Sequence, residues 1–276
     1  MMHRTFWQAT AVVALSVTAL LPTGTGRAAG GMLLRGHFVV GHSDTEAEDS
    51  TTTTKITATL SGGGQKQKLN TNDVETDHFV ATATVQKVLG DGSAQFKITF
   101  GPSTVTDNGK TTKLSMKGYY LVEHVDSSFH LMSSKTYGAN TIPAALRSSL
   151  PSIRPLEYPA KPVSVGSTWT HSETQPPFSM LTEHITVTAL GSLNGRPTIT
   201  LHGTLSQPAQ ISSQGLLFSG TLNGTNDSQL YVDTNDDATT SKNALHFSGK
   251  LSGSSSGFTV KGSFSITSTG SSHPTS

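Results

Sequence analysis

Apolar and polar residues alternate along much of this chain. In Lys55–Leu60 the apolar residues Ile56, Ala58 and Leu60 all fall on one side of an extended chain. A period of two is the pattern of a β-strand with one buried face. Similar patterns predict strands over Leu33–His42, Phe79–Leu89, Ala94–Phe100, Gly118–Asp126, Leu181–Leu190, Thr198–Leu205, Gly215–Leu222, Ser228–Asp233, Ala244–Leu251 and Gly257–Ile266.

The segment Ser43–Thr54 lacks this pattern. It is polar and acidic and includes the hydroxyl-rich run Ser50–Thr54. Two interpretations stay open, a wet continuation of the neighbouring strand or a mobile loop.

Asp-Gly and Asn-Gly pairs separate several of the predicted strands. Asp91-Gly92, Asn108-Gly109 and Asn194-Gly195 are examples. These residues tolerate the positive φ angles that a tight hairpin turn needs. The strands on either side of each pair are therefore expected to run antiparallel.

One segment follows a helical pattern instead. Ile142, Leu146 and Leu150 recur every four residues, and Pro143 suits the first turn of a helix. This predicts one short helix at 142–150. Prolines at 151, 155, 159 and 162 end the helix and favour an extended path.

These features divide the chain into five parts. Residues 1–30 have the basic start and the short apolar run, Ala9–Leu21, of a secretory signal peptide. An uncleaved anchor is the alternative. Two β-rich halves follow at 31–135 and 166–270, joined by the connector 136–165, and residues 271–276 are expected to fray. The mature chain should then be extracytoplasmic, in the periplasm or secreted, and without a transmembrane anchor.

The predicted fold is all-β and mainly antiparallel, with the one connector helix. A single curled sheet or half-barrel is the first choice, and two small β-domains are the second. The two halves share a plan, because Val85 and Asp91-Gly92 in the first correspond to Val187 and Asn194-Gly195 in the second. Gly36-x-Phe38 is matched in the same way to Gly166–Trp169. An internal duplication explains this, but so does the general similarity of all antiparallel meanders.

Composition narrows the function classes. The chain has 276 residues, 19 basic and 18 acidic, and no cysteine. This near-neutral balance gives no reason to expect a nucleic acid partner. The lack of cysteine excludes disulfides, thiolate metal ligands and a cysteine nucleophile.

The stretch Pro159-x-x-Pro162-Val163-x-Val165-Gly166-x-x-Trp169 resembles a motif of a bacterial secreted β-rich family of unknown function. In that family a proline-rich connector between two β-halves enters a strand at G-x-x-W. The resemblance covers about a dozen residues and brings no catalytic residues with it. The plan is also similar to the half-barrels of lipoprotein carriers, which enclose an apolar cavity with a helix at its mouth. For this chain, we expect Trp169 to be buried and to anchor the strand that it begins.

Three groups of potentially reactive residues give only weak indications of a metal site or a catalytic site. Asp233, Asn235 and Asp237 have the spacing of a calcium-loop opening, but Ala238 and Ala244 replace its glycine and glutamate, so a polar turn is the main interpretation. The histidines are scattered over separate predicted strands, without a zinc signature. Gly253-x-Ser255-x-Gly257 spells a nucleophile elbow, but a strand follows it where a helix is required, so we predict a hairpin loop.

The aromatic residues are mostly expected in the core, with some lining a groove. The weak candidates for ligand contact are Tyr119, Tyr120, Leu146, Leu150, Trp169 and Phe218. The first function hypothesis is an exported, non-enzymatic module that binds a lipid or another apolar or amphipathic ligand, or an envelope component, without a cofactor. The second is a structural or adhesive surface protein. The third is a hydrolase whose site is assembled from distant strands.

Overall fold

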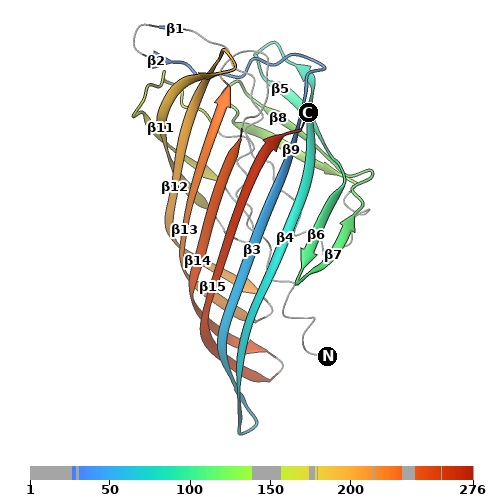
Figure 1. Ribbon diagram of the computed structural model, residues 1–276, viewed down its shortest axis with the longest axis vertical. Coiled ribbons are helices and arrows are strands. Elements are labelled where there is room, and N and C mark those ends of the chain that lie inside the picture. The colour runs from blue at the N-terminus through green and yellow to red at the C-terminus, as the bar shows by residue number, and fades with distance from the viewer. Residues whose placement is uncertain are drawn as a thin grey trace.

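Thirteen strands form one antiparallel sheet that curls around a concave face without closing (Figure 1). The structure is a computed structural model and describes residues 27–28, 31–138, 157–173, 178, 180–213, 215–231, 240–255 and 257–275. The strands are β3 (Ser43–Gly62), β4 (Gln65–Val88), β5 (Ala94–Phe100), β6 (Ser103–Asp107), β7 (Lys110–Leu114), β8 (Tyr120–Val125), β9 (Leu131–Tyr137), β10 (Thr168–Glu173), β11 (Leu181–Leu193), β12 (Arg196–Ser213), β13 (Leu216–Tyr231), β14 (Ser241–Ser255) and β15 (Phe258–Pro274); β1 (Arg27–Ala28) and β2 (Gly31–Met32) form a separate pair.

The order across the sheet is β10-β11-β12-β13-β14-β15-β3-β4-β5-β8-β9, with the hairpin β6–β7 attached to β4. The last strand, β15, pairs with β3 from Thr259 and Ser61 to Pro274 and Glu46. This long seam joins the two sequence halves into one sheet. The all-β curled sheet is therefore confirmed, and the alternative of two separate β-domains is wrong. The predicted helix at 142–150 lies outside the described residues.

Several element boundaries differ from the sequence prediction. Leu33–His42 is not a strand but an irregular segment, which buries Leu34 and Phe38 under the ends of other strands. The uncertain segment Ser43–Thr54 is the first part of β3, and β4 begins at Gln65, well before Phe79. The end of the chain does not fray as expected, because β15 continues to Pro274 and the Thr275 amide donates to Thr45 O at 3.0 Å.

The predicted turns are confirmed. Asn108-Gly109 and Asn194-Gly195 have positive φ at both residues, and Gly92 has φ 82°. Strands β14 and β15 form a hairpin at Gly253-x-Ser255-x-Gly257 as predicted, but they pair up to Ser255 and Phe258, so Gly253–Ser255 belong to β14 and not to a loop.

The start of β3 and the start of β10 are built alike, which supports an internal duplication. Gly41 and Gly166 both have φ 86°. The Gly41 amide donates to Val85 O, and the Gly166 amide donates to Val187 O. A register shift directly follows each of these valines. The equivalent of Gly166 is thus Gly41 and not Gly36, so our alignment of that segment is wrong by five residues.

Buried apolar side chains form two clusters on the concave side of the sheet. The upper cluster includes Phe79, Val85, Phe96, Ile98, Ile185, Val187, Leu201 and Leu230, with Leu34, Phe38, Phe129, Tyr158 and Val163 from connecting segments. The lower cluster includes Ile56, Ala58, Phe178, Leu181, Leu205, Leu216, Phe218, Leu222, Leu245, Phe247, Leu251, Val260 and Phe264. Because the long strands form a single layer, alternation sends these residues inward and leaves the polar ones outside.

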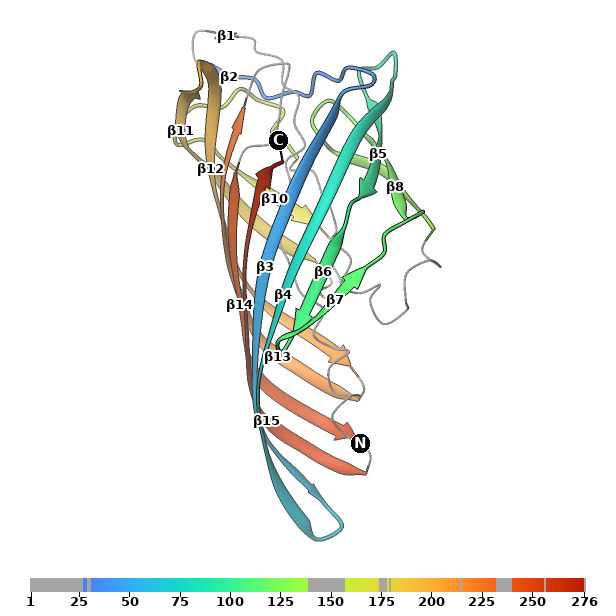
Figure 2. The same cartoon turned by 45° about the vertical axis from the view of Figure 1, so that its right-hand side comes forward.

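The proline-rich connector covers the upper end. Val163 and Met32 exchange backbone hydrogen bonds of 2.7 Å, and the Tyr158 amide donates to Ser128 O at 2.8 Å. The Arg35 guanidinium donates to Pro159 O and Ala160 O, both at 3.1 Å. These contacts give hydrogen-bond partners to the backbone of a segment that prolines, which lack an N–H, keep out of a regular sheet. The described end of the connector, residues 157–163, therefore covers the upper cluster, while the lower ends of β13–β15 curve round beneath β6 and β7 (Figure 2).

Candidate functional site

A band of polar side chains crosses the concave face between the two apolar clusters. We call it the polar belt. On β11 it lies at Glu183, between Ile185 of the upper cluster and Leu181 of the lower one. Its members are Glu183, Asn226, Ser228, Ser241, Asn243, Ser268, Ser272, Glu46, Glu48, Ser50, Thr52, Thr54, Asp73, Glu75 and Asp77.

Strand register brings these residues side by side. One continuous row of paired positions runs across the sheet through Gly203, Asn226, Asn243, Gly270, Ser50 and Asp77. The next row contains Ser268, Thr52 and Glu75. Paired residues on one face of an antiparallel sheet have side chains in reach of each other. The belt therefore spans seven neighbouring strands, six of which contribute its side chains, while β12 contributes Gly203.

Carboxylates concentrate at the β3–β4 end of the belt. Burial is the largest cause that raises the pKa of Glu46 to about 9, and the charges of Asp44 and Glu48 raise it further. Burial followed by repulsion from Asp77 and Asp107 raises the pKa of Glu75 to about 7. Raised carboxyl pKa values show that the ionised forms receive too little stabilisation at this place.

The pKa of Asp77 follows the same rule. Burial raises it to about 6, against a lowering effect of the Ser50 hydroxyl, which donates to Asp77 Oδ2 at 3.4 Å. Near neutral pH this end of the belt thus contains buried carboxyl groups in both protonation states. Groups with strongly shifted pKa values in a concave surface mark candidate functional sites.

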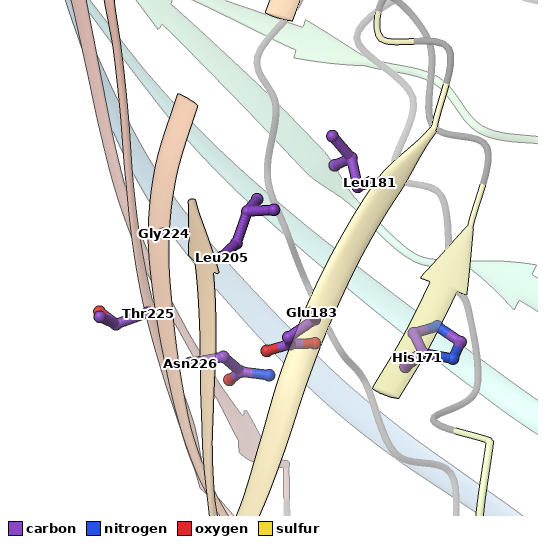
Figure 3. A pocket seen from close by; sticks show the side chains of 7 residues that line it. All are labelled: His171, Leu181, Glu183, Leu205, Gly224, Thr225 and Asn226. Carbon is purple, nitrogen blue, oxygen red and sulfur yellow. The ribbon is translucent and has the colours of Figure 1, made fainter. Parts of the chain in front are cut away.

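The opposite end of the belt lines a small pocket (Figure 3). Glu183 from β11 and Asn226 from β13 point toward each other across β12, and Leu181 and Leu205 lie on one side of them. Glycine at 203 makes this possible, because a Cβ atom there would collide with the Glu183 carboxylate. The cavity holds about 10 Å³, which is room for about one water molecule.

A larger groove of about 300 Å³ opens at the free edge of β12, where β11 has ended. Phe178, Met180, Gln207, Pro208, Ala209 and Gln210 line it. The Gln207 side chain replaces a strand partner, since its Oε1 accepts from the Thr182 amide at 3.0 Å and its Nε2 donates to Met180 O at 2.6 Å. Phe178 and Ala209 also belong to the lower cluster, so this groove leads to apolar surface.

The aromatic residues proposed for ligand contact do not form one site. Tyr119 is buried in the upper cluster, with its ring 5.2 Å from that of Phe100. Tyr120 belongs to neither apolar cluster, and its ring stacks on that of Tyr137 with 4.7 Å between the ring centroids. Phe218 is part of the lower cluster.

Trp169 is half-buried against the upper cluster. Its Nε1 donates to Glu157 O at 3.1 Å, which ties the start of β10 to the connector. This agrees with the expected anchoring role, although the burial is only partial. Leu146, Leu150, Asp233, Asn235 and Asp237 lie outside the described residues.

A Ser–His contact exists but lacks the order of a catalytic triad. Ser93 Oγ lies 2.8 Å from His124 Nε2. The Ser93 hydroxyl donates to Asp91 Oδ1 at 2.6 Å. In a triad the carboxylate orients the histidine, whereas here it accepts from the serine. Asp91 also accepts from the Ser93 amide at 2.9 Å, so the group closes the turn of a hairpin.

Within the described ranges, no three histidine or acidic residues are arranged to hold a metal ion. The same part of the chain contains no helix with the length and hydropathy to cross a bilayer. Comparison with protein-family models and with curated protein sequences finds no match. The family resemblance of the connector motif therefore remains an expectation from sequence.

The belt was missed at the level of sequence. Its members are polar residues at inward positions of strands whose alternation is otherwise apolar, for example Glu183 between Leu181 and Ile185. Such an interrupted pattern is a usable signal only when the strand register is known.

Proposed function

We propose that this chain is an exported, non-enzymatic binding protein that holds an apolar or amphipathic ligand on the concave face of its sheet. The lower cluster carries the proposal. It collects large apolar side chains from six strands on the inner side of a sheet whose first and last strands do not pair. Ligand sites are typically concave and mostly apolar, with a few polar groups. Export rests on the leader expected at 1–30.

The groove beside β12 is the proposed entrance. Its volume of about 300 Å³ reaches the lower end of the range for small-molecule sites. Ala209 contributes a small apolar side chain to the groove lining. Phe178 lines the groove as well, and its ring lies 5.5 Å from that of Phe247 in the lower cluster. A hydrocarbon chain that entered here would meet apolar side chains along its path.

Native mass spectrometry of protein purified from its own host tests the proposal. We expect a bound small molecule, or uptake of an added lipid. A fluorescent apolar probe, N-phenyl-1-naphthylamine, should also bind, and Ala209→Trp should weaken its binding about tenfold by filling the groove, a loss of about 1.4 kcal/mol.

Ser212→Trp is the matched control, because Ser212 lies on the same strand as Ala209 but is exposed on the convex side and does not line the groove. It should leave probe binding unchanged. Bare protein that takes up neither lipid nor probe would rule out the binding function. Equal effects of the two tryptophans would rule out this entrance.

A structural or adhesive role is the second candidate, because hydroxyl groups pair across the convex face. Ser43 and Thr84 lie 2.8 Å apart, and Thr45 and Thr82 lie 2.9 Å apart. Such a surface suits polar contact with another envelope component. Retention of the protein on cell envelopes of its own host, lost in Thr53→Lys but not in Ala209→Trp, would favour this role over ligand binding.

A further inference from the structure

Charge is segregated between the two faces of the sheet. On β3, β4, β13, β14 and β15 every lysine lies at an outward position, and these strands contain no arginine within their described bounds. The outward lysines are Lys55, Lys66, Lys68, Lys87, Lys242, Lys250 and Lys261. The inward carboxylates are Asp44, Glu46, Glu48, Asp73, Glu75 and Asp77.

The outward aspartates of these strands behave differently. Asp49 lies 2.8 Å from His78 Nδ1, and Asp227 lies 2.6 Å from His202 Nδ1. Each is solvent-exposed and has a basic partner on the neighbouring strand. Of the inward carboxylates, Asp44 also has a basic partner, His42 Nε2 at 3.5 Å. Glu46 and Asp77 are buried, and every lysine of their own strands faces the other side of the sheet.

Two of the concave carboxylates present unpaired oxygens while almost fully buried. Glu46 is 4% exposed and Asp77 is 2% exposed. Within the described part of the chain, Glu46 Oε2 and Asp77 Oδ1 have no hydrogen-bond partner, and the same holds for Glu75 Oε1 and Thr54 Oγ1. A buried acceptor without a donor costs free energy, and a buried charge without a counter-charge costs more. The acceptors therefore point to donors that the described strands do not supply.

The acidic end of the belt borders directly on apolar surface. Along β3 the inward residue after Thr54 is Ile56 of the lower cluster, about 7 Å further along the strand. Thr54 also pairs with Ile266, which packs against the same cluster. A ligand with a charged group at the belt can thus extend its apolar part along the lower cluster.

We propose that the acidic end of the polar belt binds the positively charged head group of an amphipathic organic cation, whose hydrocarbon tail lies on the lower cluster. The proposal rests on the proposed function and names the class of ligand. An ammonium group offers several donors and a charge, which the unpaired carboxylate oxygens around Asp77 require. A metal ion fits less well, since the described residues provide no cluster of three suitable ligands.

The test compares three amphiphiles with the same twelve-carbon tail, each below its micelle concentration at pH 8. They are dodecylammonium, dodecanoate and dodecyl maltoside, and binding is measured by isothermal titration calorimetry on the exported protein. Dodecylammonium should bind at least tenfold more tightly than the other two. The double variant Glu75→Gln/Asp77→Asn should reduce this preference to less than about twofold.

Asp49→Asn is the matched control, because Asp49 lies on β3 beside the same region but faces outward. It should keep the full preference. Equal binding of all three amphiphiles would overturn the cationic ligand and leave the proposed function intact, whereas no binding of any would contradict both. Ethylammonium that binds as tightly as dodecylammonium, or Ca²⁺ binding that the double variant abolishes, would also overturn the proposal. The preference of the unmodified protein decides the matter even if a variant does not fold.

Discussion

Single carboxyl groups on the concave face store unfavourable free energy. The pKa of Asp77 is raised to about 6, mainly by burial, so its folded-state value lies above the ordinary 3.8. Between these two values the folded chain binds protons more tightly than the unfolded chain. Stability from this group is therefore present at low pH and is lost as the pH rises toward and above 6. Glu75 and Glu46 act in the same direction up to about pH 7 and 9.

Asp77→Asn should relieve this penalty. Asn can still accept the Ser50 hydrogen bond, but it has no charge to desolvate beside Glu75. We expect the free energy of unfolding to increase by about 1–3 kcal/mol at pH 8 and to change by less than about 0.5 kcal/mol at pH 4. Urea denaturation at the two pH values measures both quantities.

Asp49→Asn serves as the control here as well, since Asp49 is exposed and bound to His78. It should not become more stable at pH 8. A less stable Asp77→Asn protein at pH 8 would show that the Asp77 charge has a stabilising partner, contrary to our account.

Residue-level chemistry was the part least accessible from sequence. Phe218 and Tyr119 were proposed together as ligand contacts, but they lie in different clusters. Asp77 and Glu183 were not predicted at all. They come together on one belt only through the pairing of seven strands, and no local motif encodes a register that depends on distant turns.

At the scale of elements, strands with apolar inward residues were predicted well and polar ones poorly. Ala94–Phe100 was predicted with its observed bounds. The first half of β4 was missed because Asp73, Glu75 and Asp77 occupy its inward positions, so apolar alternation is absent. Leu33–His42 was wrongly predicted as a strand, since an irregular segment that buries Leu34 and Phe38 has a similar apolar content. A pattern of apolar residues indicates that a segment is buried. It indicates a strand only when the apolar residues alternate, so that one side of the segment is buried.

Glycines shape the lower half of β13 and β14, where the sheet curves strongly (Figure 1). Gly220 and Gly249 are directly paired on the concave side. A Cβ atom at Gly220 would collide with Ser248 O, and one at Gly249 would collide with Ser219 O. Glycine inside a strand commonly marks such a close backbone approach.

Gly220→Ala should therefore destabilise the protein, because the two backbones must move apart. We expect a loss of about 1–3 kcal/mol in the free energy of unfolding, measured by urea denaturation with circular dichroism. Gly191→Ala in β11 is the control, since the nearest atom to its Cβ would be Thr198 Oγ1 at an ordinary 3.5 Å. It should be neutral or slightly stabilising. A neutral Gly220→Ala would mean that the curvature tolerates a side chain there.

At the scale of the whole molecule, the two sequence halves form one sheet rather than two domains. The equivalent turns at Gly41 and Gly166 support a common origin of the halves. The seam between β15 and β3 then fuses them, and Phe264 and Ile56 pair across it. Length and turn signals predicted both halves, but the seam depends on residues about 200 positions apart, which periodicity does not reveal.

This architecture predicts a single cooperative unfolding transition. Trp169 lies on the edge strand β10, far along the sheet from β3 and β4, and it is the only tryptophan once the expected leader is removed. Its fluorescence should follow the same urea curve as far-ultraviolet circular dichroism, which reports all strands. Phe264→Ala, which removes a ring packed on Phe218 and Phe247 at the seam, should lower both midpoints together and cost about 3–5 kcal/mol. Two results would show that the halves unfold independently: separate midpoints for the two signals, or a Phe264→Ala effect seen only by circular dichroism. The reason is that only a shared core transmits the loss of one seam residue to both ends of the sheet.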